Sequence, residues 1–269
     1  MDRAAQHLNE LRTRIGEYLA REPYEHELVH GDRGRLSLLL RVREEPPREI
    51  GAIVGDMLHN LRSALDARVF AIAEDLFGPL ESPRDRVIAL PIEDTRKEFA
   101  DRTAPWRKHF GDDGAERLRS IVRPLQVFGP TSRYWCERHE STDLADEHSH
   151  HLATATRLRR IAALSNIDKH RGMHLPWLGI DHIESWSTSD GEVFFSMEPG
   201  QWGDGTLILS VTPQAPQTDA TQRGLTAKMT LVLPHHNFND GSVSDELDNL
   251  MHFVECGLGI LGYEARAVT

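Results

Sequence analysis

Residues 53–70 read IVGDMLHNLRSALDARVF, and we expect the rest of the chain to be organised around this stretch. Its apolar residues recur at steps of three and four, which places them on one face of a helix: Val54, Met57, Leu58, Leu61, Leu65 and Val69. His59, Arg62 and Asp66 follow the same spacing on the adjoining face. The pattern predicts a buried helix whose polar flank is either a solvated edge of the core or the lining of a site.

The composition is typical of a soluble globular protein. Of the 269 residues, 39% are hydrophobic and 27% are charged. No run of about 18 apolar residues occurs, and the first residues are charged, so we expect a cytoplasmic protein that does not enter a membrane. The two cysteines form no Cys-x-x-Cys pair, which disfavours a disulfide framework. The net charge of −11 disfavours a protein whose whole surface attracts nucleic acid.

The residues before the central helix predict another helix and a β-hairpin. An amphipathic helix is expected over residues 1–22, where a proline follows it. Residues 24–29 and 36–42 favour strands, and the glycines between them suit a hairpin turn. Two prolines then end the second strand, and we expect the central helix to run to about residue 77.

The middle of the chain is less regular. Residues 78–112 are rich in Pro, Arg and Asp, and a short strand is expected at Val87–Leu90. A short helix is expected at about residues 114–122. A second long helix is expected at about residues 143–171, because its apolar residues again recur at helical spacing.

After residue 176 the sequence favours strands. Four such runs predict an antiparallel meander, and they cover residues 179–186, 192–197, 206–212 and 225–233. A closing helix follows at about residues 243–263. We therefore predict an α+β fold in which residues 1–269 form one compact domain, with a helical part to about residue 175 and a β-rich part over about 176–240.

A second polar stretch lies near the end of the later long helix. Residues 166–171 read NIDKHR, and Asn166 and His170 lie one helical turn apart. This stretch is either part of a site or a charged last turn, in which Lys169, His170 and Arg171 complement the helix dipole.

The two polar stretches together resemble a family of uncharacterised bacterial proteins. These proteins pair a GD-x-x-HNLRSALDH segment with a later NIDKHR segment, often after a Pro-Pro. The matching residues here are Gly55–Asp66 and Leu164–Arg171, with Pro46 and Pro47 upstream. The resemblance implies a site shared by the two helices, and it names no reaction.

A weaker resemblance is to HEPN domains, helical nucleotide-binding and ribonuclease modules that dimerise and use an Arg followed a few residues later by a His. Arg62 fits that pattern, but Ala67 stands where the relatives have the His. The resemblance implies a HEPN-like helical core, a homodimer, and RNA or a nucleotide as ligand in a bacterial defence or stress setting. His170 or His59 would then supply the imidazole that handles the proton.

Three hypotheses about function follow. The first is a metal-independent ribonuclease without a cofactor, whose candidate catalytic residues are Arg62, His170, His59, Asp66, Asn60, Asn166, Asp168, Lys169 and Arg171. The second is a non-catalytic protein in which these residues form structural ion pairs between the two helices, and a partner binds the β-rich part.

The third hypothesis is a metal-dependent hydrolase that uses a divalent cation. Imidazoles and carboxylates suitable as ligands gather before and within the start of the second long helix: His139, Glu147, His148, His150 and His151. Glu147 and His151 would meet at one helical turn. The alternative interpretation of this segment is a solvated, exposed stretch without a metal.

Overall fold

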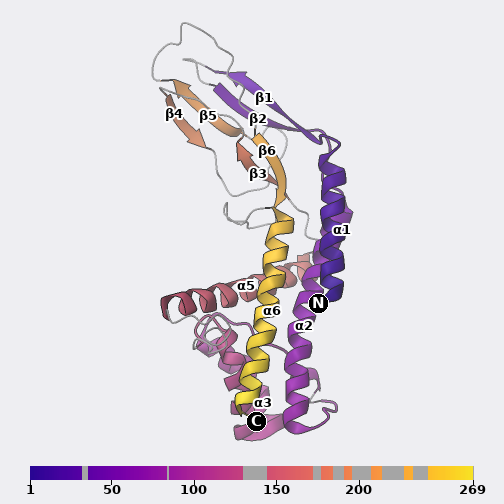
Figure 1. The fold of residues 1–269 in the computed structure, drawn as a ribbon, viewed down its shortest axis with the longest axis vertical. Helices are drawn as coiled ribbons and strands as arrows, with labels where there is room; N and C mark the ends of the chain where they lie inside the picture. The colour runs from indigo at the N-terminus through magenta and orange to yellow at the C-terminus, as the bar shows by residue number, and fades with distance from the viewer. Residues whose placement is uncertain are drawn as a thin grey trace. The chain divides into compact units, whose positions relative to one another are not determined.

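A computed structural model describes residues 1–31, 36–83, 85–129, 144–171, 177–183, 191–195, 207–213, 227–232 and 242–268. It contains long α-helices and antiparallel β-strands (Figure 1), so the predicted α+β class is confirmed. None of the helices that it describes has the length and apolar character needed to cross a membrane.

The N-terminal elements follow the sequence pattern closely. Helix α1 spans Asp2–Leu19, and strands β1 (Tyr24–His30) and β2 (Leu36–Val42) pair antiparallel as the predicted hairpin. Helix α2 spans Arg48–Phe77 and carries the central stretch. All six of its predicted core residues are at most 1% exposed, because the apolar spacing places them on one face.

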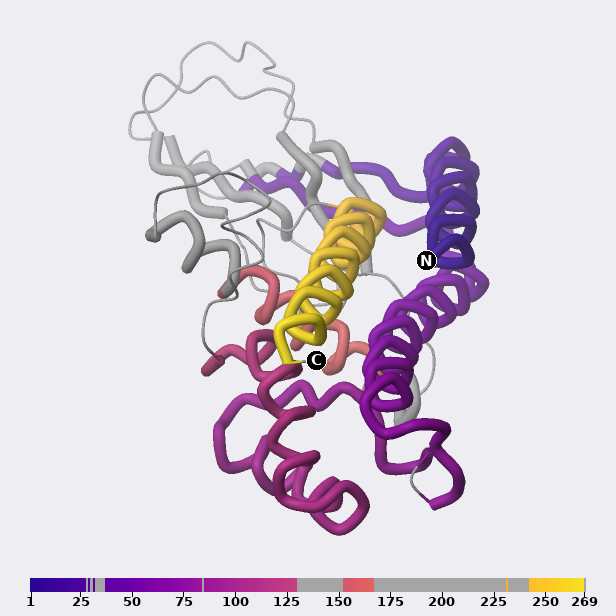
Figure 2. The backbone as a smooth tube through the Cα atoms, turned by 60° about the horizontal axis from the view of Figure 1, so that its bottom comes forward, coloured from indigo at the N-terminus to yellow at the C-terminus, as the bar shows by residue number. Residues whose placement is uncertain are grey.

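The region after α2 differs from the prediction. The expected strand at Val87–Leu90 is wrong: a short 3-10 helix, η2, covers Asp85–Val87, and residues 88–94 belong to no helix or strand. The chain turns back past α2 before it enters helix α3 (Figure 2). The expected short helix at 114–122 is only the second half of α3, which spans Arg96–Val122.

Helix α3 begins at a capping box. The Thr95 hydroxyl accepts from the Glu98 N–H at 3.2 Å, and the Glu98 carboxylate accepts from the Thr95 N–H at 3.0 Å. This reciprocal pair satisfies two backbone donors that a helix start leaves open. The Thr-x-x-Glu spacing was therefore the sequence signal for a helix beginning at residue 96.

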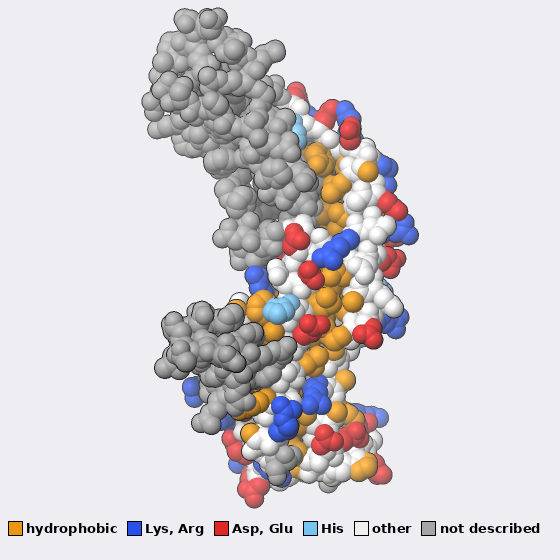
Figure 3. Space-filling view, viewed as in Figure 1, with side chains coloured by type: hydrophobic (Ala, Val, Ile, Leu, Met, Phe, Trp, Pro, Cys, Tyr) orange, Lys and Arg blue, Asp and Glu red, His pale blue; other side chains and the backbone are white. Residues whose placement is uncertain are grey.

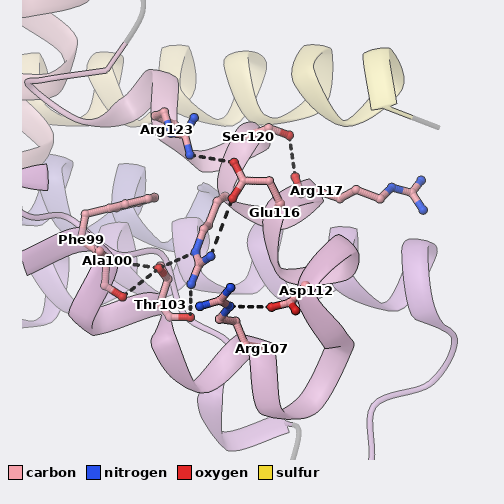
Figure 4. A network of polar contacts seen from close by, with 10 residues as sticks. Phe99, Ala100, Thr103, Arg107, Asp112, Glu116, Arg117, Ser120 and Arg123 are labelled. Carbon is pink, nitrogen blue, oxygen red and sulfur yellow. Dashed lines mark hydrogen bonds and ion pairs between the residues drawn. The ribbon is translucent and has the colours of Figure 1, made fainter. Parts of the chain in front are cut away.

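The two halves of α3 are separated by a kink at Gly111, whose φ of 72° is a left-handed value that glycine adopts without a steric cost. Arg119 links the halves, because its guanidinium donates to the Thr103 hydroxyl at 2.8 Å and to the Thr103 carbonyl at 3.2 Å. Figure 4 shows this network, in which Arg107 also bonds Asp112 across the kink at 2.7 Å. A second 3-10 helix, η3 (Arg123–Leu125), follows.

The later strands do not form the expected meander. They are β3 (Trp177–Ile183), β4 (Gly191–Phe195), β5 (Leu207–Pro213) and β6 (Ala227–Val232). The described strands form one sheet in the order β1-β2-β5-β4 and a second pair, β3-β6, all antiparallel. The meander prediction is wrong because strand propensity carries no information on long-range pairing, and β2 takes β5 as its second neighbour.

Helices α5 (Leu144–Arg171) and α6 (Val243–Val268) complete the fold. The chain divides into two compact units. The helical unit comprises residues 1–6, 55–172 and 248–269, and the β unit comprises residues 7–54 and 173–247. The prediction of one compact domain stays a prediction.

Candidate functional site

The predicted site on α2 contains an ion pair. Arg62 and Asp66 lie one helical turn apart, and a terminal guanidinium nitrogen of Arg62 lies 3.1 Å from Asp66 Oδ1. Arg62 Nε donates to Asp66 Oδ2 at 3.2 Å. The two side chains are 17% and 33% exposed, so solvent screens the pair less than a surface pair.

Both members of this pair also bind the backbone of Leu90. The Leu90 N–H donates to Asp66 Oδ1 at 2.9 Å. The Arg62 guanidinium donates to the Leu90 carbonyl oxygen. The pair thus binds both the N–H and the carbonyl group of Leu90, a residue that belongs to no helix or strand. We name Arg62, Asp66 and Leu90 together the Leu90 clamp.

The neighbouring backbone groups are satisfied by side chains as well. Trp106 Nε1 donates to the Val87 carbonyl at 3.0 Å. Gln126 Nε2 donates to the Pro91 carbonyl at 2.7 Å, and Gln126 Oε1 accepts from the Glu93 N–H at 3.0 Å. Trp106 and Gln126 are each 1% exposed. Residues 87–94, the bridging segment, are therefore held by side chains of α2 and α3 and of the residue that follows η3.

Helix α5 reaches the same segment. Arg159 Nε lies 2.5 Å from Asp94 Oδ1, and another guanidinium nitrogen donates to Asp94 Oδ2 at 2.7 Å. This two-point contact is the geometry in which an arginine binds a carboxylate most specifically. The two long helices that carry the predicted polar stretches thus both contact the bridging segment, and on α5 the described contact is made by Arg159.

The core beneath this region joins three helices. A Cβ added at Gly257 of α6 would lie 3.4 Å from the side chains of both Leu65 and Leu158. Leu65 precedes Asp66 of the clamp, and Leu158 precedes Arg159. The polar contacts to the bridging segment therefore begin directly beside the place where α2, α5 and α6 pack together.

Glu93 is a half-buried carboxyl that sequence reasoning missed. Burial raises its pKa above the usual range, and Glu98 and Asp94 add to that effect, whereas Arg102 and Arg62 oppose it. No residue spacing singles out Glu93, because burial, the largest cause of its raised pKa, is not visible in its own stretch of sequence.

The other α2 candidates do not join the clamp. His59 is exposed, and its Nε2 lies 3.5 Å from the Ser63 hydroxyl. Asn60 donates from Nδ2 to the Asp56 carbonyl at 2.8 Å, on the same helix. The contacts of both residues thus stay within α2.

The α5 candidates are only partly within the described residues. Asn166 is exposed. The backbone of the following residues continues α5, but the side chains of the remaining candidates lie outside the described residues: Asp168, Lys169, His170 and Arg171. Their convergence with Arg62 stays a prediction.

The metal hypothesis falls mainly on residues that the structure does not describe. His139 lies outside the described residues, as do the side chains of Glu147, His148, His150 and His151. Among the side chains that the structure does describe, no three His, Cys, Asp or Glu residues gather as a metal site.

The fold and the site thus define an α+β protein in which an arginine and an aspartate of one long helix bind the backbone of an irregular segment. Comparison of the chain with known protein families, with curated proteins and with solved structures finds no match in any of them. The resemblance to the bacterial family and to HEPN domains stays a prediction.

Proposed function

We propose that the chain is a non-catalytic partner-binding protein in which Arg62 and Asp66 are architectural. The observation that carries this proposal is the engagement of both side chains with the Leu90 backbone. A phosphate would have to compete with a carboxylate and a carbonyl oxygen for the Arg62 guanidinium. If the Arg62 guanidinium turned to a phosphate, the Leu90 carbonyl would lose its hydrogen-bond donor. An unpaired carbonyl costs free energy where water is partly excluded.

The charge distribution favours a positively charged partner for the β-rich part. Residues 173–247, which comprise the β-rich part and the start of α6, contain ten Asp and Glu residues against two Arg and Lys residues. The remaining residues contain 32 acidic and 29 basic residues, so most of the net charge of −11 comes from this one stretch. This negative charge speeds association with a positively charged partner, and it repels nucleic acid, which is itself negative.

The residues outside 173–247 do not share this excess of one sign. On the face drawn in Figure 3, acidic and basic side chains of the described residues are interspersed rather than gathered by sign. Long-range attraction of a charged partner is therefore expected from the β-rich part of the chain.

We expect the protein to bind a fluorescein-labelled, lysine-rich peptide in a fluorescence-anisotropy titration at low salt, with an affinity that falls as salt rises. Changing Asp181, Asp190, Asp204 and Asp219 together to Asn should weaken this binding, because the local negative charge falls by four.

The matched control removes four exposed carboxylates of the helical unit by the same change: Asp56, Asp101, Asp112 and Asp113. Equal weakening by both quadruple variants would mean that only net charge matters and would contradict a binding role for the β-rich part. Tighter binding of a single-stranded RNA than of the peptide would contradict the proposed partner class.

HEPN-like RNA processing is the second candidate, and one observation favours it. His59 is exposed on the helical turn before Arg62, and Arg62 itself keeps 17% exposure. An imidazole and a guanidinium on neighbouring turns could act as proton carrier and phosphate ligand.

Cleavage of labelled total RNA in excess EDTA tests this candidate. The architectural proposal predicts no cleavage by the wild type above a buffer blank. Cleavage that persists in EDTA and disappears in a folded His59→Ala variant would instead establish the ribonuclease. Lys97→Ala, a change at an exposed position of α3, is the control for a surface substitution, since its activity should equal that of the wild type, whereas a contaminating nuclease would cleave equally in every preparation, including His59→Ala.

A further inference from the structure

One histidine of the β unit lies on the apolar side of the hairpin. Successive side chains of a strand point to opposite faces, so Tyr24 and His26 share one face of β1, and Glu25 and Glu27 share the other. The two glutamates are paired across the strands with Arg43 and Arg41, as expected for the solvated face. His26 is thus separated from the charged face of its own hairpin.

His26 is half-buried, and the part of the chain that the structure describes leaves one nitrogen of its ring without a polar partner. Its Nε2 is buried and has no hydrogen-bond partner among the described residues. Leu40, which is 0% exposed, lies directly opposite on β2, and Leu38 on the same face is 1% exposed. The Tyr24 ring lies 5.8 Å away, centre to centre.

No described acidic side chain lies on this face of β1 or β2. The titratable neighbour on β1 is Tyr24, and the described β2 residues on this face, Leu38, Leu40 and Val42, are aliphatic. A second proton on the His26 ring would place a cation against these side chains, and burying an uncompensated charge is costly. We propose that His26 makes the β1–β2 hairpin acid-sensitive, so that the hairpin is stable while the imidazole is neutral and loosens when it takes a second proton.

The direction of the effect follows from proton linkage. Burial lowers the pKa of His26 from its ordinary value of 6.5. Between the lowered folded value and the ordinary unfolded value, the unfolded chain binds more protons than the folded chain. The contribution to stability is therefore fully present above about pH 6.5 and is lost as the pH falls through 6.5 toward the folded pKa.

Hydrogen exchange of the hairpin amides between pH 7.5 and 5.5 tests the proposal, with protection factors corrected for intrinsic exchange. In the wild type we expect the protection of the β1 and β2 amides to fall by up to about tenfold at the lower pH, since pH 5.5 lies one unit below the ordinary value of 6.5 that the unfolded chain retains. In His26→Leu the protection should not fall, because the titrating group is gone.

His59→Leu is the matched control, since it removes an exposed histidine, and its hairpin protection should fall as in the wild type. His26→Gln provides a second neutral side chain if the leucine variant does not fold, and the same constant protection is expected. An equal fall in the wild type and in the folded His26 variant would overturn the proposal, as would no fall in the wild type.

Discussion

Replacing Arg62 with Ala is expected to lower the free energy of unfolding by about 2–4 kcal/mol in a urea denaturation experiment. The change removes the ion pair with Asp66 and leaves the Leu90 carbonyl without its donor. Asp66→Ala should cost a similar amount, because it removes the acceptor of the Leu90 N–H. The double variant should cost less than the sum of the single changes, since both act on one contact set.

Arg14→Ala is the control for the loss of an arginine from a helical ion pair. Arg14 and Glu17 of α1 are 54% and 53% exposed, so this change should cost less than about 1 kcal/mol. A loss at Arg62 as small as that at Arg14 would contradict an architectural role. Such a small loss would instead favour a role of Arg62 in binding an anion.

The largest single loss is expected for Trp106→Ala, at about 3–5 kcal/mol of unfolding free energy. Trp106 is 1% exposed, and its indole N–H donates to the Val87 carbonyl at 3.0 Å. The change creates a cavity and also removes a hydrogen bond at the start of the bridging segment.

Trp106→Phe separates the two effects, because it keeps much of the aromatic volume and removes the N–H donor. We expect it to cost clearly less than the alanine variant, although more than the loss of one hydrogen bond alone, about 0.5–1.5 kcal/mol. Equal losses in the two variants would mean that the cavity contributes little. A Trp106→Ala variant within about 1 kcal/mol of the wild type would contradict tight packing of the bridging segment.

The sequence predicts the helices of this fold better than its sheets. The apolar residues of α2 and α6 recur at helical spacing, and burial follows that spacing directly. The hairpin is local, since its turn connects strands that are neighbours in the chain. The pairing of β2 with β5 joins residues about 170 positions apart, and nothing in either strand specifies the other.

The candidate site was predictable only in part. Arg62 and Asp66 could be placed on one helical face, because their spacing is one turn. Their actual partner, Leu90, could not be found, since a backbone group carries no side-chain signature. For the same reason the role of Gln126 could not be predicted, since it binds two backbone groups of the bridging segment.

Asp66 and Arg62 hold the bridging segment through the Leu90 backbone. The most direct measurement is hydrogen exchange at the Leu90 amide in the wild type and in Asp66→Ala, under conditions in which both are folded. The architectural role predicts strong protection in the wild type and a loss of protection at Leu90 in the variant, with the amides in the middle of α2 still protected. Equal protection of the Leu90 amide in both proteins would contradict it.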